Sequence, residues 1–466
     1  MFIQNLPSRT TPLRDHWTRL CAAALVLLST SALAQAPLNG LPEYSDETHI
    51  AFNSFSSAPA DQCGTRCGKS LAMDGDLLVL GASYFIRSSS LPGPTGARYP
   101  IVLEYQNGDW IKVANLQTWV DNVFVSTQWT SAATAVAVEG DVVVLGDPDE
   151  NGPGVGAVRV FVKPPGGWPG PIDITRLRPV AILTAGGRRD RLGTSVAILN
   201  GTIVAGAPDA ELFGIGSIPE HGAVYIWEEP SGGWGAIGQT PGMPAARQPD
   251  HLVAPSDFGG NRMGERIAVA EIDGRDEIVV ADEHADELFL LRRNGLTWRF
   301  DRLQADLGAP APFDTVNQLV YDGTTLLVGY EEQPFFHVAE REDEDPMVPW
   351  HVARLAREPC QASQPGCSSN DFTAMGRGLA LVPGGILAGD PLMTSDGQVL
   401  SGGLFRFLRP DSGWTDVTLP WSAHFTPVYP TGFELPRALQ RWAETIVYDN
   451  GRLAVNIPLR PGIGFE

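Results

Sequence analysis

The sequence predicts an all-β fold: a seven-bladed β-propeller made of four-stranded antiparallel blades. Short β-branched stretches alternate with turn residues, and the chain contains 51 Gly and 38 Pro. This composition favours many short strands joined by tight turns. No convincing amphipathic helix follows the N-terminal leader. A unit of about 60 residues also recurs along the chain, which is typical of a repeat architecture.

Two independent markers define the repeat. The first is a turn glycine between a small-residue strand and a strongly apolar strand, and its copies are Gly75, Gly140, Gly201, Gly274, Gly323, Gly384 and Gly451. The second is a tryptophan after a later turn, and its copies are Trp110, Trp168, Trp234, Trp298, Trp350 and Trp414. Because both markers have the same period, coincidence is a poor explanation. We expect the tryptophans to pack between blades.

The third copy shows the expected strands most clearly: Ser195–Leu199, Thr202–Gly206, Gly222–Trp227 and a fourth strand starting near Trp234. A single four-stranded sheet cannot bury both faces, whereas radial packing of successive sheets can. The last copy has only its first two strands. We therefore expect an N-terminal strand near residues 48–55 to complete the last blade and to close the ring. An open array of sandwich domains is the alternative, but the unit is too small for a sandwich.

The N-terminus reads as a secretory leader. Three arginines precede the apolar stretch Leu20–Leu28, and Ala32-Leu33-Ala34 fits a signal-peptidase site. We predict that residues 1–34 are a signal peptide and that residues 35–466 form a single propeller domain. An uncleaved anchor is the alternative. The expected location is secreted, periplasmic or at the cell surface, with no membrane insertion after cleavage.

The charge of the chain restricts its partners. With 54 acidic and 33 basic side chains, the formal net charge is −21. Nucleic acids and anionic membranes attract basic surfaces, so we predict neither as a partner. A protein or a glycan is expected instead, and a basic partner would suit the charge.

Four cysteines remain after the predicted cleavage: Cys63, Cys67, Cys360 and Cys367. An even number of cysteines in an exported protein indicates disulfides. We favour the local pairs Cys63–Cys67 and Cys360–Cys367, each of which encloses a short loop. A zinc site with four thiolate ligands is the alternative, although the spacings do not fit the usual pattern.

Two short motifs flank the first two strands of the third copy: Leu192-Gly193 before the first strand and Gly206-Ala207-Pro208 at the end of the second. With these motifs the repeat resembles the FG-GAP repeat of integrin α-chain propellers and of many secreted bacterial proteins. Leu192-Gly193 stands in the Phe-Gly position, and Gly206-Ala207-Pro208 matches the second motif. A weaker copy pairs Met375-Gly376 with Gly389-Asp390-Pro391. The resemblance covers most of residues 64–457, although the Phe is replaced throughout. It implies a seven-bladed propeller that usually serves adhesion or protein interaction.

One face of the propeller is predicted to bind the partner. The long connections between the second and third strands and between blades lie on the same face, and functional residues often lie on such loops. Carboxylates follow the second strand in five blades. The predicted binding residues are Asp147, Asp149, Glu150, Asn151, Asp209, Glu211, Asp282, Glu283, Asp286, Glu287 and Asp390. A solvated rim of turn-forming residues is the alternative, and residues 340–345 are expected to form a solvated loop.

A calcium site is the one cofactor that the sequence suggests. Residues 147–152 match the first half of an EF-hand loop, with candidate ligands Asp147, Asp149 and Asn151. The twelfth position is Val158, so the bidentate glutamate of that loop is missing. A turn without metal is the alternative.

These observations predict an exported binding or adhesion protein that is not an enzyme. The histidines are scattered, and neither a nucleophile elbow nor a phosphate-binding loop is present. The alternative is a secreted carbohydrate-active enzyme that uses paired carboxylates on the same face.

Overall fold

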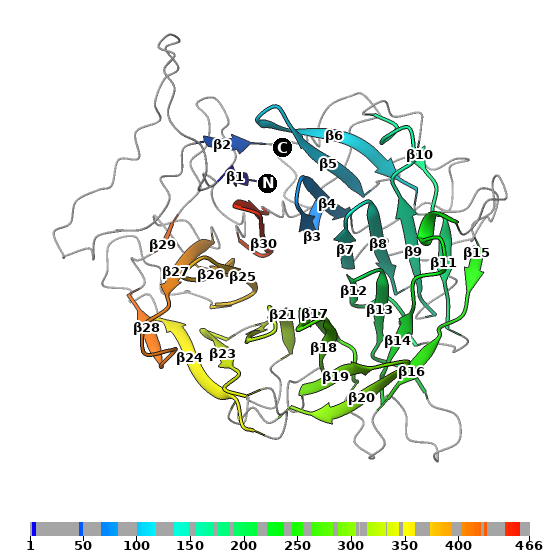
Figure 1. Cartoon of the computed structure of the whole chain (residues 1–466). Coiled ribbons are helices and arrows are strands. Elements are labelled where there is room, and N and C mark those ends of the chain that lie inside the picture. Colours follow the sequence, from blue (N-terminus) through cyan, green and yellow to red (C-terminus); the bar gives the residue numbers. More distant parts are fainter. Residues whose placement is uncertain are drawn as a thin grey trace, which may run out of the picture.

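The computed structural model describes residues 2–5, 46–49, 67–82, 100–117, 135–148, 155–170, 176–185, 190–211, 221–236, 245–254, 262–282, 288–303, 307, 315–331, 333–343, 348–358, 373–393, 402–420, 424–425 and 443–456. Among these residues, strands form seven sheets in a ring around a central axis (Figure 1).

Sheets 1 to 6 consist of strands that follow one another in the chain. Sheet 1 contains β3 (Cys67–Asp74), β4 (Leu77–Ala82), β5 (Ile101–Gln106) and β6 (Asp109–Leu116). Sheet 2 contains β7 (Ala135–Glu139), β8 (Val142–Asp147), β9 (Ala157–Val162) and β11 (Ala181–Leu183). Sheet 3 contains β12 (Val196–Leu199), β13 (Thr202–Ala207), β14 (Ala223–Trp227) and β16 (His251–Val253).

The same order continues around the ring. Sheet 4 contains β17 (Arg266–Ile272), β18 (Arg275–Ala281), β19 (Leu288–Asn294) and β20 (Thr297–Arg302). Sheet 5 contains β21 (Val316–Tyr321), β22 (Thr325–Tyr330), β23 (Phe335–Glu340) and β24 (His351–Arg357). Sheet 6 contains β25 (Gly378–Val382), β26 (Gly385–Asp390), β27 (Gly403–Leu408) and β29 (His424–Phe425). Sheet 7 joins β30 (Ile446–Asp449) and β31 (Arg452–Val455) to β1 (Phe2–Asn5) and β2 (Asp46–His49).

The first strand of each sheet lies nearest the central axis (Figure 1). These inner strands contact one another in circular order, and β30 contacts both β25 and β3. The structure therefore confirms an all-β propeller of small antiparallel sheets. Six blades, rather than the predicted seven, are built from consecutive strands, because sheet 7 draws its strands from both ends of the chain.

The ring closes differently from the prediction. The expected closing strand near residues 48–55 corresponds to β2, which ends at His49. A further strand, β1, pairs with β31 and lies inside the segment that we predict to be the signal peptide. The closing sheet thus includes residues that the sequence assigns to the leader.

Three sheets have a fifth strand, which the four-stranded prediction does not include. β10 (Arg176–Leu177), β15 (Ala245–Arg247) and β28 (Val417–Leu419) pair in parallel with the outer strands of sheets 1, 2 and 5. Each comes from a long connection between the third and fourth strands of the following sheet. Trp234 lies in the long connection between the third and fourth strands of sheet 3. It therefore begins a short 3-10 helix (Trp234–Ala236) instead of the predicted fourth strand.

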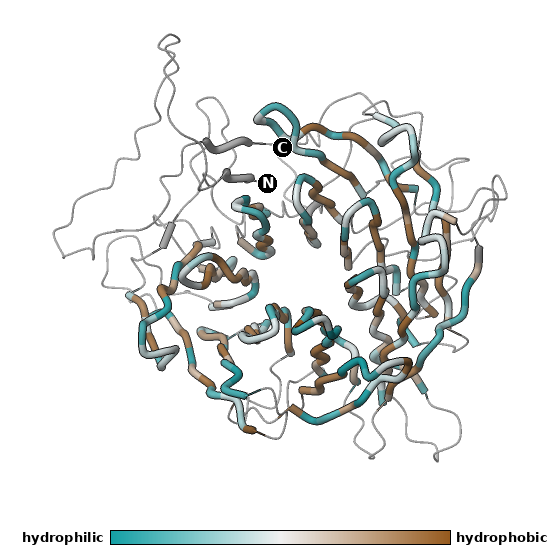
Figure 2. Tube along the Cα trace, in the orientation of Figure 1, coloured by the Kyte–Doolittle hydropathy of each residue, from teal (hydrophilic) through white to brown (hydrophobic). Residues whose placement is uncertain are grey.

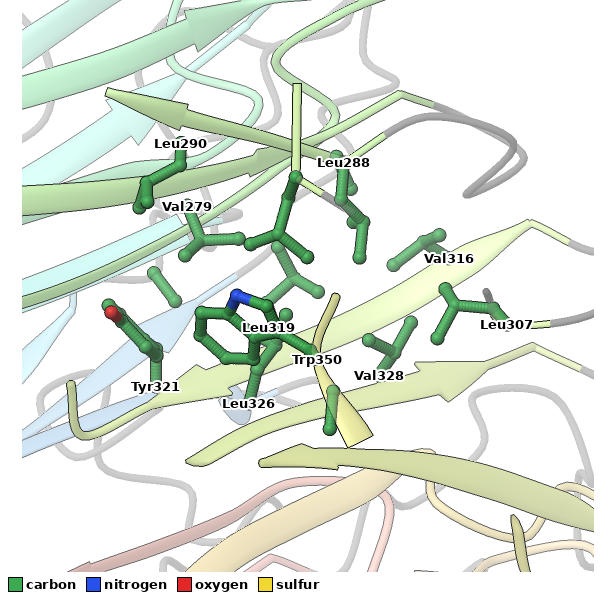
Figure 3. Packing of buried hydrophobic residues seen from close by; sticks show 14 of the residues in the cluster. Val279, Leu288, Leu290, Leu307, Val316, Leu319, Tyr321, Leu326, Val328 and Trp350 are labelled. Atoms are coloured by element: carbon green, nitrogen blue, oxygen red, sulfur yellow. The ribbon is translucent and has the colours of Figure 1, made fainter. Parts of the chain in front are cut away.

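Apolar clusters fill the spaces between neighbouring sheets, and Figure 2 shows apolar residues along most strands. All six marker tryptophans pack in these clusters, as predicted. Figure 3 shows Trp350 of sheet 5 against Tyr321 and Leu326, in the cluster shared with Val279 of sheet 4. Burial of a side chain of this size contributes about 2–3 kcal/mol, so these tryptophans help to hold the blades together.

Backbone contacts between paired glycines join neighbouring blades. A Cβ atom on Gly206 would lie 1.9 Å from the carbonyl oxygen of Gly264 in the next blade. Glycine pairs with the same contact are Gly146 with Gly193 (2.1 Å) and Gly329 with Gly376 (2.0 Å), and Gly389 approaches Ala443 in the same way (2.0 Å). Only a residue without a side chain allows backbones to come this close. This close contact explains why each of the two motifs of the repeat contains a glycine.

A second set of contacts links the turns at the inner ends of the blades. Carboxylates at the end of one inner strand accept hydrogen bonds from backbone N–H groups in the turn of the next blade. Asp449 accepts from Gly75 (2.6 Å), Asp74 from Gly140 (2.5 Å), and Glu139 from Gly201 (2.7 Å). These acidic residues therefore have a structural role on the face opposite the predicted binding face.

Replacing Gly206 tests the backbone contact. We expect Gly206→Ala to destabilise the protein by at least ~2 kcal/mol, because the new methyl group would overlap a backbone atom that cannot move freely. Urea unfolding measures the change. The control is Gly166→Ala, since a Cβ at Gly166 would meet nothing within 4 Å. Equal stability of the two variants would contradict the role that we assign to the contact.

Candidate functional site

Three of the predicted binding carboxylates are buried. Asp147, Asp282 and Asp390 are 1%, 1% and 0% exposed, so they do not belong to a solvent-facing rim. Asp147 pairs with Arg159 at 3.1 Å, and Asp390 pairs with Arg357 of the preceding blade at 2.5 Å. Asp147 and Asp390 directly follow the glycine of the second strand, where neighbouring backbones touch and exclude water, whereas Asp282 follows Ala281. A charge buried there needs a partner of opposite charge.

A buried polar pair occupies this region in several blades, with different chemistry in each. Arg159, Tyr225 and His337 are equivalent in register, because each lies opposite the residue that precedes the second-strand glycine. Tyr225 donates a hydrogen bond to Asp190 at 3.3 Å, and His337 Nδ1 lies 2.8 Å from the hydroxyl of Tyr330. In sheets 2, 3 and 5 this register position thus holds a polar side chain inside the blade.

Several predicted residues lie outside the described part of the chain. They are Asp149, Glu150, Asn151, Glu283, Asp286, Glu287, Cys63, Cys360 and Cys367. Cys67 begins β3, but its side chain is not among those described. Of the predicted calcium ligands, Asp147 already binds Arg159. The calcium site and the two disulfides therefore stay predictions.

An acidic cluster on sheet 3 brings two predicted residues next to one that the sequence did not single out. We call Asp190, Asp209 and Glu211 the sheet 3 cluster. Asp190 is only 3% exposed, whereas Glu211 is exposed. Asp209 is held by Arg262, whose Nε and Nη2 atoms lie 2.9 and 2.8 Å from Oδ1. The backbone N–H of Asp209 donates to the carbonyl oxygen of Asp190 at 3.3 Å, which joins the two segments.

The environments of these carboxyl groups differ. Burial raises the pKa of the Asp190 carboxyl, and the charges of Glu211 and Asp209 raise it further. Hydrogen bonds from the Tyr225 hydroxyl and the Glu211 backbone oppose this rise. Burial also raises the pKa of Tyr225, which keeps its hydroxyl as a donor. Protonation of Asp190 is thus easier than in an ordinary exposed aspartate.

Sequence reasoning missed Asp190 for a physical reason. It precedes Leu192-Gly193 by two residues, in a segment that looks like an ordinary connection between blades. Its burial and its contact with Tyr225, 35 positions away, exist only in the folded chain. The buried His221, whose Nδ1 has no hydrogen-bond partner among the described residues, was missed in the same way.

An open pocket of about 570 Å³ lies between sheets 5 and 6, on the face opposite the predicted binding face. Its walls include Asp322 from the β21–β22 turn, Glu340 and Glu342 at the end of β23, and Trp414 after β27. The expectation of a solvated loop over residues 340–345 is corrected for its first two residues. Glu340 ends β23 and accepts two bonds from Arg409, at 2.9 and 2.6 Å.

No family model and no curated protein matches the chain. Solved structures with a similar fold include a protein named as a 6-phosphogluconolactonase from Bacteroides uniformis, with 12% identity and a TM-score of 0.41, covering 73% of this chain and 81% of that chain. Hydrazine synthase from Kuenenia stuttgartiensis has 10% identity and a TM-score of 0.39, with coverage of 76% and 80%. A protein named as a glucose dehydrogenase from Thermus thermophilus has 12% identity and a TM-score of 0.37, with coverage of 70% and 91%.

These similarities correct one prediction. The sequence predicts that the chain is not an enzyme, yet the solved structures just named are of proteins named as enzymes. The prediction of no enzymatic activity is therefore not kept. At these identities and TM-scores the likeness assigns no reaction to this chain. Within the described ranges, no helix is long and apolar enough to cross a membrane.

The buried His337 should make the stability of the folded protein depend on pH. Burial, aided by the charge of Arg354, lowers its pKa from 6.5 to about 4. The unfolded chain therefore binds a proton more readily, and stability falls as the pH drops from 6.5 towards 4. For this one residue, we expect a loss of roughly 2 kcal/mol between pH 7 and pH 5.

A double variant, Tyr330→Phe/His337→Phe, isolates this effect, since it removes both polar partners together. Phe occupies the equivalent register position in sheets 4 and 6, as Phe289 and Phe405. Urea unfolding of both proteins at pH 7 and pH 5 should show a smaller pH dependence in the variant. Parallel pH profiles would contradict the assignment.

Proposed function

We propose that the protein is a carbohydrate-active enzyme that uses the carboxyl groups of the sheet 3 cluster. The observation that supports this most directly is the contrast between Asp190, which is buried with a raised pKa, and Glu211, which is exposed beside it. Pairs of carboxyl groups in contrasting environments are typical of acid–base catalysis on glycosidic bonds. Among the partners predicted from the sequence, a glycan fits this chemistry.

The residues divide into roles that follow from their contacts. Asp190 is the proposed general acid: its proton passes to the glycosidic oxygen as the bond from that oxygen to the anomeric carbon breaks. Glu211 is the proposed general base: it takes a proton from a water molecule whose oxygen bonds to that carbon. Asp209 forms an ion pair with Arg262, and its charge contributes to the raised pKa of Asp190. That charge favours the protonated form of the acid.

We also propose that the ring is a seven-bladed propeller of the FG-GAP type, closed by sheet 7. The inner strand of sheet 7 contacts the inner strands of sheets 6 and 1, and apolar clusters lie on both of its sides. The paired glycines explain why this repeat carries Gly in both of its motifs.

Export through the predicted leader (residues 1–34) is part of the proposal, with residues 35–466 as the mature propeller in the secreted, periplasmic or surface compartment. Cleavage there would remove β1 and leave sheet 7 with three strands. Calcium at Asp147, Asp149 and Asn151 and the pairs Cys63–Cys67 and Cys360–Cys367 are further proposals, each resting on the sequence.

Asp190→Asn tests the catalytic role. We expect turnover of a polysaccharide substrate, found by screening the wild-type protein on a panel of common glycans, to fall at least ~100-fold, because Asn cannot donate the proton. The pKa of Asp190 is raised in the folded state, so its ionisation near neutral pH costs stability. The variant should therefore melt at the same or a higher temperature at pH 7, and any gain should vanish near pH 4.

The matched control is Asp273→Asn, an exposed turn residue of sheet 4. It should change neither turnover nor melting temperature. A purely structural Asp190 would give the reverse pattern, with a lower melting temperature and unchanged turnover. If the wild-type protein cleaves none of the glycans, the proposed activity is wrong.

A further inference from the structure

The pocket between sheets 5 and 6 is lined by both arginines and carboxylates. Its two arginines are already neutralised by carboxylates. Arg409 bonds to Glu340, and Arg341 bonds to both carboxylate oxygens of Glu277 in the preceding blade at 3.0 and 3.2 Å. The cationic groups of the pocket are therefore poorly placed to hold an anion.

The Arg409–Glu340 pair is a feature of the propeller frame. Lys163 pairs with Glu104 at 2.9 Å, and Arg293 pairs with Glu228 at 2.5 Å, in each case between neighbouring blades near the end of the third strand. A pair that recurs at other blade junctions has a structural explanation. The groups of the pocket that need another explanation are the ones that lie outside these pairs.

Hydrogen-bond acceptors make up most of the remaining groups. Asp322 uses Oδ1 to accept bonds from its own turn, at Thr324 and Thr325. Its Oδ2 atom and the carboxylate of Glu342 have no hydrogen-bond or ion-pair partner among the described residues. His351 Nε2 lies 2.8 Å from the carbonyl oxygen of Trp414, so Nε2 carries a hydrogen and donates it to that oxygen.

Part of the pocket wall is apolar. Leu381 and Val382 are half-buried and line the same pocket. A ligand that fits therefore presents N–H donors and positive charge to Asp322 and Glu342 and lays methylene groups against the two apolar side chains. The pocket volume of about 570 Å³ is within the range of small-molecule sites.

We propose that this pocket binds an alkylammonium group, a positively charged amine on a short methylene chain. Such a group occurs in free polyamines and in lysine side chains, and the binding chemistry is the same for both. The site lies on the opposite face from the sheet 3 cluster, so it does not depend on the proposed enzymatic activity.

Titration calorimetry of the full chain tests the proposal, with spermidine and Nα-acetyl-lysine amide as the two probes. We expect one saturable site in 150 mM salt, the ionic strength at which diffuse surface attraction is largely screened. Asp322→Asn and Glu342→Gln should each weaken binding at least tenfold. The amide oxygen that Asp322→Asn introduces would still accept the bonds of its turn, so the fold should persist, and thermal melting checks this. Stronger binding of spermidine would identify free polyamines as the source, and stronger binding of the lysine derivative would identify a protein side chain.

The control for this highly acidic chain is Asp273→Asn, which removes the equivalent turn charge of sheet 4 outside the pocket. Its affinity should equal that of the wild-type protein. The proposal is overturned if neither probe binds saturably to the wild-type protein. It is also overturned if the control weakens binding as much as the pocket variants do, since the attraction would then come from the net charge alone.

Discussion

The contact between paired glycines of neighbouring blades is the constraint on which the rest of the structure depends. Gly206 and Gly264 bring two backbones together without side chains between them. This close approach sets the distance between sheets, and that distance lets the inner strands touch and the apolar clusters fill the space behind them. It also shields the residues that follow each second-strand glycine. The burial of Asp147 and Asp390 is a consequence of the same packing.

A polar group at a shielded position needs a buried partner, and the blades that carry such a group supply the partner in different ways. Arg159 with Asp147 is a buried ion pair, whereas His337 with Tyr330 is neutral. In sheet 3 the second-strand position is Ala207, and Asp190 enters from the connection between blades, with a hydroxyl from Tyr225 as its partner. A hydroxyl compensates a buried carboxylate less well than an arginine does. Burial therefore raises the pKa of Asp190, as the acid role that we propose for this carboxyl group requires.

The two faces of the propeller are formed by different connections between strands. The face of the sheet 3 cluster is formed by connections that leave the second strands and that link the blades. The opposite face carries the connections between the third and fourth strands, and three long ones add β10, β15 and β28 to neighbouring blades. The connection that leads to β28 also forms one wall of the pocket between sheets 5 and 6. Loop length alone therefore did not identify a single functional face.

The sequence by itself determined the repeat, the propeller class and the packing of the marker tryptophans. These depend on local patterns: a left-handed turn at positions such as Gly201, alternating strands, and an aromatic residue at a fixed interval. Tertiary structure decided which carboxylates are buried, where Asp190 lies and how the ring closes. Those features depend on contacts between residues that are far apart in the chain, such as Asp449 with Gly75, 374 positions away. A spacing pattern records that a carboxylate follows a strand, but only the neighbouring blade decides whether water reaches it.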